Sequence, residues 1–325
     1  MSQILYTALL MVLILPAAWA EIPQYTVDES GVHIHGVAPS NPIIYDNDWW
    51  TDIFDAYYLW AQADLGNANL KGNIVTRDMW DHPDYHYDMT QCMNDAQKAI
   101  ALARESGIEN IPQPIAGADQ ALSRPASGKI EDTQFQSTHG SRLMIQEAKK
   151  ASPEQPLLIM AGGPLTTVAN ALLEAPEIAD NIIVFALSVS SYRYNGKDGW
   201  SVYIVAKQTR LVEWATDDFW DKNSVFQPGD FSVLPDTPLK KEMQRFIRTE
   251  LGQANQLGDG AALVWLFNHG CWRGVQERAA EWNGRAAVFP LAPPRDVLDI
   301  PKNQSDLHLM NQTFLQTMAN QAVYK

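Results

Sequence analysis

The sequence predicts an open, mostly parallel α/β sheet with helices on both faces. Apolar runs rich in β-branched residues alternate with segments of helical periodicity, which is typical of parallel sheets covered by crossover helices. An acidic loop directly follows one of the buried runs, and open α/β sheets bind ligands at such strand ends. With 325 residues, 46% of them apolar, the chain can bury a full core. We expect a single α/β domain over residues 21–325.

The first twenty residues have the form of a secretory signal. An apolar stretch, Ile4 to Leu15, precedes the small-residue pattern Ala18-Trp19-Ala20, which is typical of a cleavage site. The stretch is short for a membrane span, although a membrane anchor or a buried helix would also account for it. We expect cleavage after residue 20, a periplasmic or secreted protein, and no membrane association afterwards.

The elements of the mature chain follow in order. An extended segment or hairpin is expected at 25–35. Buried strands are expected at 42–45, 72–76, 156–160 and 182–187. Helices are expected at 96–105, 142–151 and 167–173. Beyond Ala206 the pattern changes to helices and aromatic-rich loops, with an amphipathic helix at 239–251 and a short apolar helix at 259–267.

Charge and cysteine content narrow the function. The formal net charge of -14 argues against a nucleic-acid polymer as partner, because phosphate binding draws on clustered Lys and Arg. A small uncharged nucleoside or glycoside remains compatible with it. Cys92 and Cys271 allow either one disulfide or two free thiols, and no Cys/His spacing indicates zinc. The oligomeric state is open, and a homo-oligomer is compatible with the sequence.

The acidic loop after the 42–45 run holds four aspartates: Asp46, Asp48, Asp52 and Asp55. If the loop continues as a helix, the last three fall within roughly a 60° arc, because successive residues advance about 100°. Carboxylates about 4 Å apart repel by roughly 4 kcal/mol at an effective dielectric near 20. A converging set therefore needs a counter-charge, and a hard divalent cation supplies it. The alternative is a solvated turn that caps a helix.

A further acidic position, Asp259, lies between two glycines where a predicted helix begins. It is either a helix N-cap or a distant member of the same site. Asp46 and Asp48 with Asp259 are also similar to the metal motifs of haloacid dehalogenase-type phosphatases. Trp50, however, stands where that family has Thr or Val, and residues 253–257 are polar where it has a strand.

Residues 46–56, DNDWWTDIFDA, resemble without a gap the pattern DTDMGNDVDDA of the nucleoside hydrolase family, the inosine-uridine preferring nucleoside N-ribohydrolases. Residues 111–118 and 163–166 are similar to two further segments of that family, and Ala175 to Ile178 follow at the expected distance. The resemblance runs from about residue 42 to 187, and more loosely to 267. It marks the chain as similar to a divergent, exported member with an open, Rossmann-like α/β sheet.

The resemblance implies a calcium site and a reaction. Carried over to this chain, the calcium ligands are Asp48, Asp55, the carbonyl of Gly162 and Asp259, with Asp46 as a hydrogen-bond neighbour. Such an ion holds two sugar hydroxyls and a water, and Asp48 takes the proton of that water as it attacks the anomeric carbon. The expected function is a calcium-dependent hydrolase of N-glycosidic or related glycosidic bonds. The alternative is a non-catalytic, metal-dependent sugar- or nucleoside-binding protein.

The sugar-recognition part of the pattern is altered. Phe54 replaces an Asp, Asp78 stands near a missing Asn, and residues 198–201 replace a Glu and an Asn. Residues 188–190, SVS, replace Gly-Gly-Ala. Aromatic residues fill several of these gaps, which favours a glycoside larger than a nucleoside. We expect these residues to bind substrate: Asp46, Trp49, Trp50, Asp52, Phe54 and Trp200. His82 or His86 could protonate the leaving group, or the loop could be purely structural.

Overall fold

The computed structural model describes residues 22–49, 53–79, 88–192, 194–214, 226–227, 229–249 and 257–325. Within these residues an eight-stranded sheet forms the centre, in the order β5-β4-β3-β6-β7-β8-β12-β9. Neighbouring strands are parallel except for the final pair, β12 with β9. The strands are β3 (Pro42–Asn47), β4 (Asn69–Val75), β5 (Pro114–Ala116), β6 (Leu157–Gly162), β7 (Ile182–Leu187), β8 (Arg210–Trp214), β9 (Gln276–Arg278) and β12 (Val297–Ile300). The predicted fold class is confirmed.

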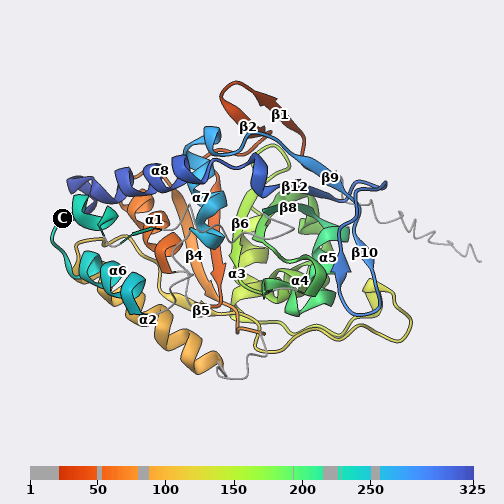
Figure 1. The fold of residues 1–325 in the computed structure, drawn as a ribbon. Coiled ribbons are helices and arrows are strands. Elements are labelled where there is room, and N and C mark those ends of the chain that lie inside the picture. The colour runs from red at the N-terminus through yellow and green to blue at the C-terminus, as the bar shows by residue number, and fades with distance from the viewer. Residues whose placement is uncertain are drawn as a thin grey trace, which may run out of the picture.

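Helices cover both faces of the sheet (Figure 1). On one side lie α1 (Ile53–Asp64), α2 (Met89–Glu105), α6 (Pro238–Thr249), α7 (Ala261–Phe267) and α8 (Leu307–Ala319). On the other side lie α3 (His139–Ala148), α4 (Thr166–Glu174) and α5 (Gly199–Gln208). Two separate apolar clusters fill the space between the sheet and these two layers. Successive side chains of a strand point to opposite faces, so Tyr45 belongs to the first cluster and Ile44 to the second.

The direction of chain progression reverses between β3 and β6. The chain forms β3, β4 and β5 outward in one direction and then returns to place β6 on the other side of β3. Asn47 at the end of β3 is aligned with Gly162 at the end of β6. The loops that leave two adjacent parallel strands part at such a point, and they open a crevice at the carboxyl edge. The acidic loop therefore starts at the place where this architecture positions ligands.

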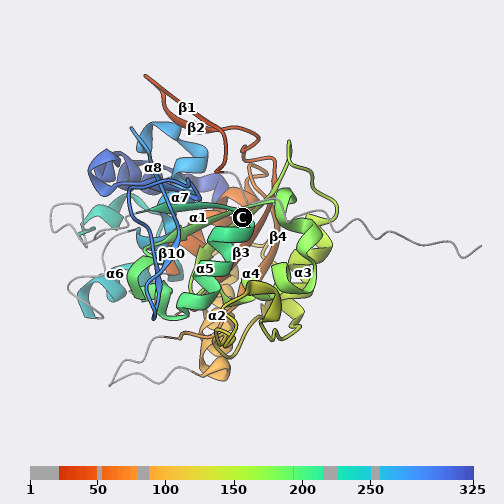
Figure 2. The same cartoon turned by 90° about the vertical axis from the view of Figure 1, so that its right-hand side faces the viewer.

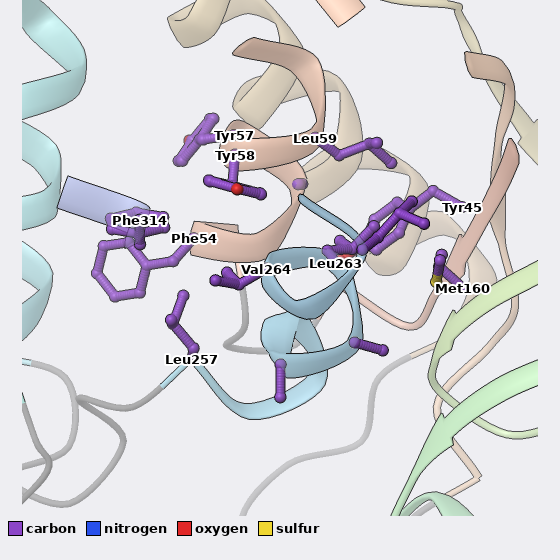
Figure 3. Close-up of a cluster of buried hydrophobic side chains, with 14 of the residues drawn as sticks. Tyr45, Phe54, Tyr57, Tyr58, Leu59, Met160, Leu257, Leu263, Val264 and Phe314 are labelled. Carbon is purple, nitrogen blue, oxygen red and sulfur yellow. The ribbon is translucent and has the colours of Figure 1, made fainter. Parts of the chain in front are cut away.

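An aromatic cluster lies under α1 and α8. Phe54 packs against Phe226, Phe231, Phe246 and Phe314, with ring centroids 5.4 to 6.2 Å apart. Figure 3 shows Phe54 and Phe314 side by side, with Leu257 below them and Val264 next to Phe54. The cluster joins the first helix of the chain to its last one, so the two ends of the described chain share one core.

The predicted strands at 42–45, 72–76, 156–160 and 182–187 are confirmed as β3, β4, β6 and β7. The predicted helices are confirmed with shifted ends, and a 3-10 turn, Gly258–Gly260, precedes α7. Four strands of the main sheet were not predicted: β5, β8, β9 and β12. A small antiparallel pair, β10 (Glu281–Trp282) with β11 (Ala287–Val288), was also missed.

Both cysteines are buried free thiols, so the second of the two cysteine alternatives holds. Burial raises the pKa of each thiol to about 12. Among the described residues, no helix has both the length and the apolarity needed to cross a membrane. The expected signal segment, residues 1–20, lies outside the described residues.

The predicted hairpin at 25–35 is confirmed as β1 (Tyr25–Asp28) paired with β2 (Gly31–Ile34), and it projects from the body of the molecule (Figure 2). The ring of His33 stacks on that of His269 with centroids 4.5 Å apart. The indole nitrogen of Trp265 donates a hydrogen bond to the carbonyl of Val32 at 2.9 Å. These contacts attach the hairpin to the turn after α7.

The partial burial of His269 makes stability depend on pH. Burial, with a smaller effect of the His33 charge, lowers the pKa of His269 below its ordinary value of 6.5. The unfolded chain then binds more protons, so the stabilising contribution is present above pH 6.5 and is lost as the pH falls through the folded-state pKa. We expect His269→Phe to show a smaller loss of stability than wild type between pH 7 and 5 in denaturant titrations. An unchanged slope in His269→Phe would contradict the assignment.

Candidate functional site

Asp46 lies at the end of a buried hydrogen-bond chain at the carboxyl edge. The hydroxyl of Thr76 donates to its Oδ1 at 2.6 Å, and the Thr76 and Thr167 hydroxyl oxygens are 2.5 Å apart. The backbone N–H of Ala118 donates to the hydroxyl oxygen of Thr167 at 2.9 Å. Burial outweighs the Thr76 hydrogen bond and raises the pKa of Asp46 to about 7. Oδ2 of Asp46 has no hydrogen-bond partner.

Asp48 directly follows β3 and lies against the turn after β6. A Cβ atom placed on Gly163 would be 2.9 Å from the backbone nitrogen of Asp48 and 3.2 Å from its Cβ. Glycine is needed where two backbones approach so closely. Asp48 is not helical, so the condition under which it would share one helix face with Asp55 is not met. The chain turns sharply here instead, because Trp49 has a φ of 66°.

Asp55 lies in the first turn of α1 and is almost fully buried. The phenol of Tyr45 donates to its Oδ2 at 2.5 Å, and the amide of Asn47 donates to the Tyr45 oxygen at 2.6 Å. A Cβ atom on Gly260 would be 2.7 Å from the Cβ of Asp55. The turn that carries Asp259 therefore packs directly on Asp55.

Asp259 reaches the same place from the far end of the chain. A Cβ atom on Gly162 would be 3.0 Å from both Cβ and Oδ2 of Asp259. The side-chain amide of Asn195 donates to its Oδ1 at 3.1 Å. The N-cap position of α7 is Gly260 and not Asp259, so the helix-capping alternative fails. The structure thus places Asp48, Asp55, Gly162 and Asp259 around the ends of β3 and β6.

These oxygen donors suit a hard divalent cation by their chemistry. Within the described part of the chain, however, no three acidic, His or Cys side chains are grouped so that they could hold a metal ion. Carboxylates repel one another when no cation separates them, and Asp55 and Asp259 are each hydrogen-bonded to a neighbour, Tyr45 and Asn195. Oδ2 of the neighbouring Asp46 is buried and has no hydrogen-bond partner.

Two predicted substrate contacts near the loop are wrong. Trp49 is 2% exposed and stacks on Trp60, with its indole nitrogen 3.4 Å from the carbonyl of Ile74. Phe54 is 2% exposed within the aromatic cluster described above. A ring packed among core side chains presents no face to a sugar. The other predicted contacts of this loop, Trp50 and Asp52, lie outside the described residues, as do His82 and His86.

Trp200 is also buried and does not meet a substrate. It is 2% exposed, stacks on Tyr203, and donates from its indole nitrogen to Thr133 at 3.0 Å. The preceding Asp198 accepts hydrogen bonds from Thr166 at 2.7 Å and from the backbone of Leu122 at 2.9 Å. This segment therefore joins the loop after β5 to α4 and α5. The resemblance led us to expect sugar contacts from the same segment.

Asp78 and Asp48 both lie within electrostatic reach of Cys92. The pKa of the Cys92 thiol, raised chiefly by burial, is raised further by the charges of both carboxylates. Asp78 is itself buried, and it stands near the position where the resemblance has an asparagine.

Backbone strain is concentrated at the carboxyl edge. The described non-glycine residues with positive φ are Trp49, Ser188 and Ser191, and they follow β3 and β7. Ser188 has a φ of 46° where the resembled pattern has glycine. Such conformations cost of order 1–3 kcal/mol each and gather at functional sites. Sequence reasoning missed this feature, and it missed Tyr45, Asn47 and Asn195.

Comparison with known proteins adds to this geometry. No protein-family model matches the chain, and no curated protein matches it. Solved structures, in contrast, match the chain over most of its length. The inosine-guanosine nucleoside hydrolase (IG-NH) superposes with a TM-score of 0.62 at 15% identity, over 85% of this chain and 98% of that one. The chain has a nucleoside hydrolase-like fold.

Two further structures share the nucleoside hydrolase-like fold. The purine-preferring ribonucleoside hydrolase from Gardnerella vaginalis has a TM-score of 0.59 at 14% identity, covering 86% of this chain and 99% of that chain. A nucleoside hydrolase-related protein from Saccharophagus degradans, associated with carbohydrate metabolism, has a TM-score of 0.53 at 13% identity, covering 88% and 72%. Identity this low establishes the architecture and leaves the reaction to the residues of this chain.

Proposed function

We propose that the protein is a calcium-dependent hydrolase that cleaves an N-glycosidic bond of a nucleoside, or a related glycosidic bond. One observation carries the proposal. Three glycine contacts bring the acidic loop, with Asp48 and Asp55, and the distant Asp259 together at the ends of β3 and β6. The topology alone does not require a distant acidic turn to dock there, and gathering carboxylates costs energy unless a cation compensates it.

The residues of the site would have different roles in this reaction. Asp48, Asp55, Asp259 and the carbonyl of Gly162 would hold the ion, which when bound supplies charge to polarise a water and two sugar hydroxyls. Asp48 would accept the proton of the attacking water. The surrounding carboxylates favour the positive charge that develops on a sugar ring as its glycosidic bond breaks. Asp46 is held by Thr76 next to this set.

Removing the cation tests the metal site. We expect Ca²⁺ at one hundred times its Kd to stabilise the wild-type protein by about 2.7 kcal/mol, and a chelator to reverse the effect. Asp259→Asn should lose most of this Ca²⁺ response, because a neutral amide replaces one of the charged ligands. Thermal unfolding with Ca²⁺ and with chelator measures both.

A matched control is Asp306→Asn, because Asp306 caps α8 through the backbone of Leu309 and lies outside the site. It should keep the full Ca²⁺ response even if it is less stable. A wild-type protein that responds neither to Ca²⁺ nor to chelator would rule the calcium site out. Turnover of nucleosides and glycosides, followed by sugar release, then tests the reaction itself.

A specific observation favours the second candidate, a metal-dependent sugar- or nucleoside-binding protein without turnover. The residues that replace the family's sugar-binding positions, Phe54 and Trp200, are buried and do not face a ligand. The metal part of the site is thus better preserved than the part that would orient a ribose. Either function has a small nucleoside or glycoside as its partner, and the oligomeric state remains to be measured.

We also propose that the protein is exported. The support is the apolar stretch and the small-residue pattern before Glu21 in the sequence. Mass spectrometry of the protein from its host decides the point, since retention of residues 1–20 on the mature chain would contradict it.

A further inference from the structure

Trp49 is the residue beside Asp48 at which backbone strain and burial coincide. Its φ of 66° lies in the left-handed region, which a bulky side chain rarely adopts. Trp49 is 2% exposed and Asn47 is 1% exposed, whereas Asp48 between them is only half-buried. The sharp turn therefore buries both neighbours of Asp48 and leaves Asp48 itself accessible at the carboxyl edge of the sheet.

The indole of Trp49 packs in the aromatic core beneath the turn. It stacks on Trp60 with ring centroids 5.7 Å apart and an interplanar angle of 24°, and it meets the ring of Tyr45 edge-on at 5.7 Å. Trp60 is fixed in turn, because its indole nitrogen donates to Oδ1 of Asn73 at 3.0 Å. The contacts of Trp49 thus join the turn to β3, β4 and α1.

Asn47 holds the backbone of the same turn. Its Oδ1 accepts the N–H of Trp49 at 2.5 Å, which is the local hydrogen bond by which an asparagine turns the chain. Its Nδ2 donates to the phenol oxygen of Tyr45 at 2.6 Å, so the amide is fixed at both ends. A glycine at position 49 would take the left-handed conformation freely. A tryptophan keeps it because the packing around the ring and the bond from Asn47 compensate for the strain.

We infer that Trp49 is a positioning residue for Asp48, because its buried indole locks the turn of residues 47–49 in the conformation that presents the Asp48 carboxylate at the carboxyl edge. The inference rests on the proposed function, in which Asp48 accepts a proton, and it adds a residue that acts only through Asp48. A catalytic group misplaced by about 1 Å can lower a rate by about 100-fold. Loss of the indole should therefore slow the chemical step more than it weakens ligand binding.

The test compares the turnover of the full chain and its variants, with Ca²⁺ present, on inosine and on 4-nitrophenyl β-D-ribofuranoside, an N-linked and an O-linked glycoside. We expect Trp49→Gly, which allows the left-handed backbone but removes the ring, to lower kcat by about 10- to 100-fold with a much smaller change in KM. Trp49→Phe keeps a ring against Trp60 and should retain most of the turnover. Asn47→Ala removes the acceptor of the Trp49 N–H, so it should also lower kcat, and it serves if Trp49→Gly fails to fold.

A double variant shows whether Trp49 acts through Asp48. If it does, Trp49→Gly should slow the turnover of the wild-type chain and have no further effect in an Asp48→Asn background, because residues that act as a unit are not additive. If Trp49 served only to fill the core, its loss would lower the midpoint of urea unfolding and would change kcat equally in both backgrounds or in neither.

The control is Phe289→Ala, because Phe289 is 4% exposed and belongs to the apolar cluster on the opposite face of the sheet from Trp49. It should lower the midpoint of urea unfolding and leave the kcat of the folded protein unchanged. Wild-type kcat in the folded variants of Trp49 and Asn47, or equal effects of Trp49→Gly in the two backgrounds, would overturn the inference and leave the proposed function standing. Cleavage of neither glycoside by the wild-type chain would overturn the proposed function, and the inference with it.

Discussion

Replacing Asp48 by asparagine should lower the turnover of a cleavable nucleoside or glycoside by about 10²–10⁴-fold, the usual contribution of a positioned general base. Asparagine keeps the shape and one ligand oxygen but cannot accept the proton of the attacking water. Binding of a sugar ligand should therefore survive with a modest loss. Single-turnover kinetics and equilibrium binding on the same preparation separate the two quantities.

Asp95→Asn is the matched control for Asp48→Asn. Asp95 pairs with Lys98 on the surface of α2, so its neutralisation changes the net charge equally without touching the site. Wild-type turnover in Asp48→Asn would remove the general base from the mechanism. Wild-type protein that binds a nucleoside or glycoside yet cleaves none would instead establish the sugar-binding alternative.

Placing an aspartate at position 54, as in the pattern that the loop resembles, should destabilise the protein severely. Loss of a buried phenylalanine alone costs about 3–5 kcal/mol, and a carboxyl group surrounded by aromatic rings adds the cost of burying an unpaired polar group. We expect Phe54→Asp to lower the free energy of unfolding by more than about 3 kcal/mol. Urea titration followed by tryptophan fluorescence measures the loss.

Val233→Asp controls for the chemical change itself. Val233 is 58% exposed, and surface substitutions usually stay within about 0.5 kcal/mol. If Phe54→Asp were as stable as wild type, position 54 would tolerate a carboxylate at the edge of the site. The alteration of the sugar-recognition pattern at position 54 would then be reversible by one substitution. The structure predicts the opposite, because the surrounding core is built for an aromatic ring.

The strands that could be predicted from sequence are those with uninterrupted apolar runs. β6 and β7 are buried along their whole length. β8 and β12 escaped prediction because each carries a charged residue inside the sheet, Glu213 and Asp299, and both side chains are fully buried. Their partners are distant: Arg278 donates to Asp299 at 2.6 Å. A short apolar run that contains a carboxylate resembles a loop in sequence. Only the structure shows the partner that allows the carboxylate to be buried in a strand.

The aspartates of the site were predictable because the resemblance to nucleoside hydrolases assigns the acidic loop and the distant Asp259 to one site. Composition alone does not relate these two segments. Tyr45 and Asn195 carried no such signal, since a tyrosine in a strand or an asparagine in a loop is common in any fold. The aromatic predictions failed for a related reason. A tryptophan that stacks on a sugar and one that fills a core have the same sequence signature, and the topology decides between them.

The assembly of the site from distant segments has a consequence for folding. The ends of β3 and β6 and the start of α1 belong to the first half of the chain, whereas Asp259 and Gly260 arrive only after most of it has been synthesised. Closing so long a loop costs entropy that later contacts must offset. A cation that binds the closed arrangement alone would favour it by mass action. Its binding would then report that the last part of the chain has docked, and a truncated or misfolded chain would remain insensitive to the ion.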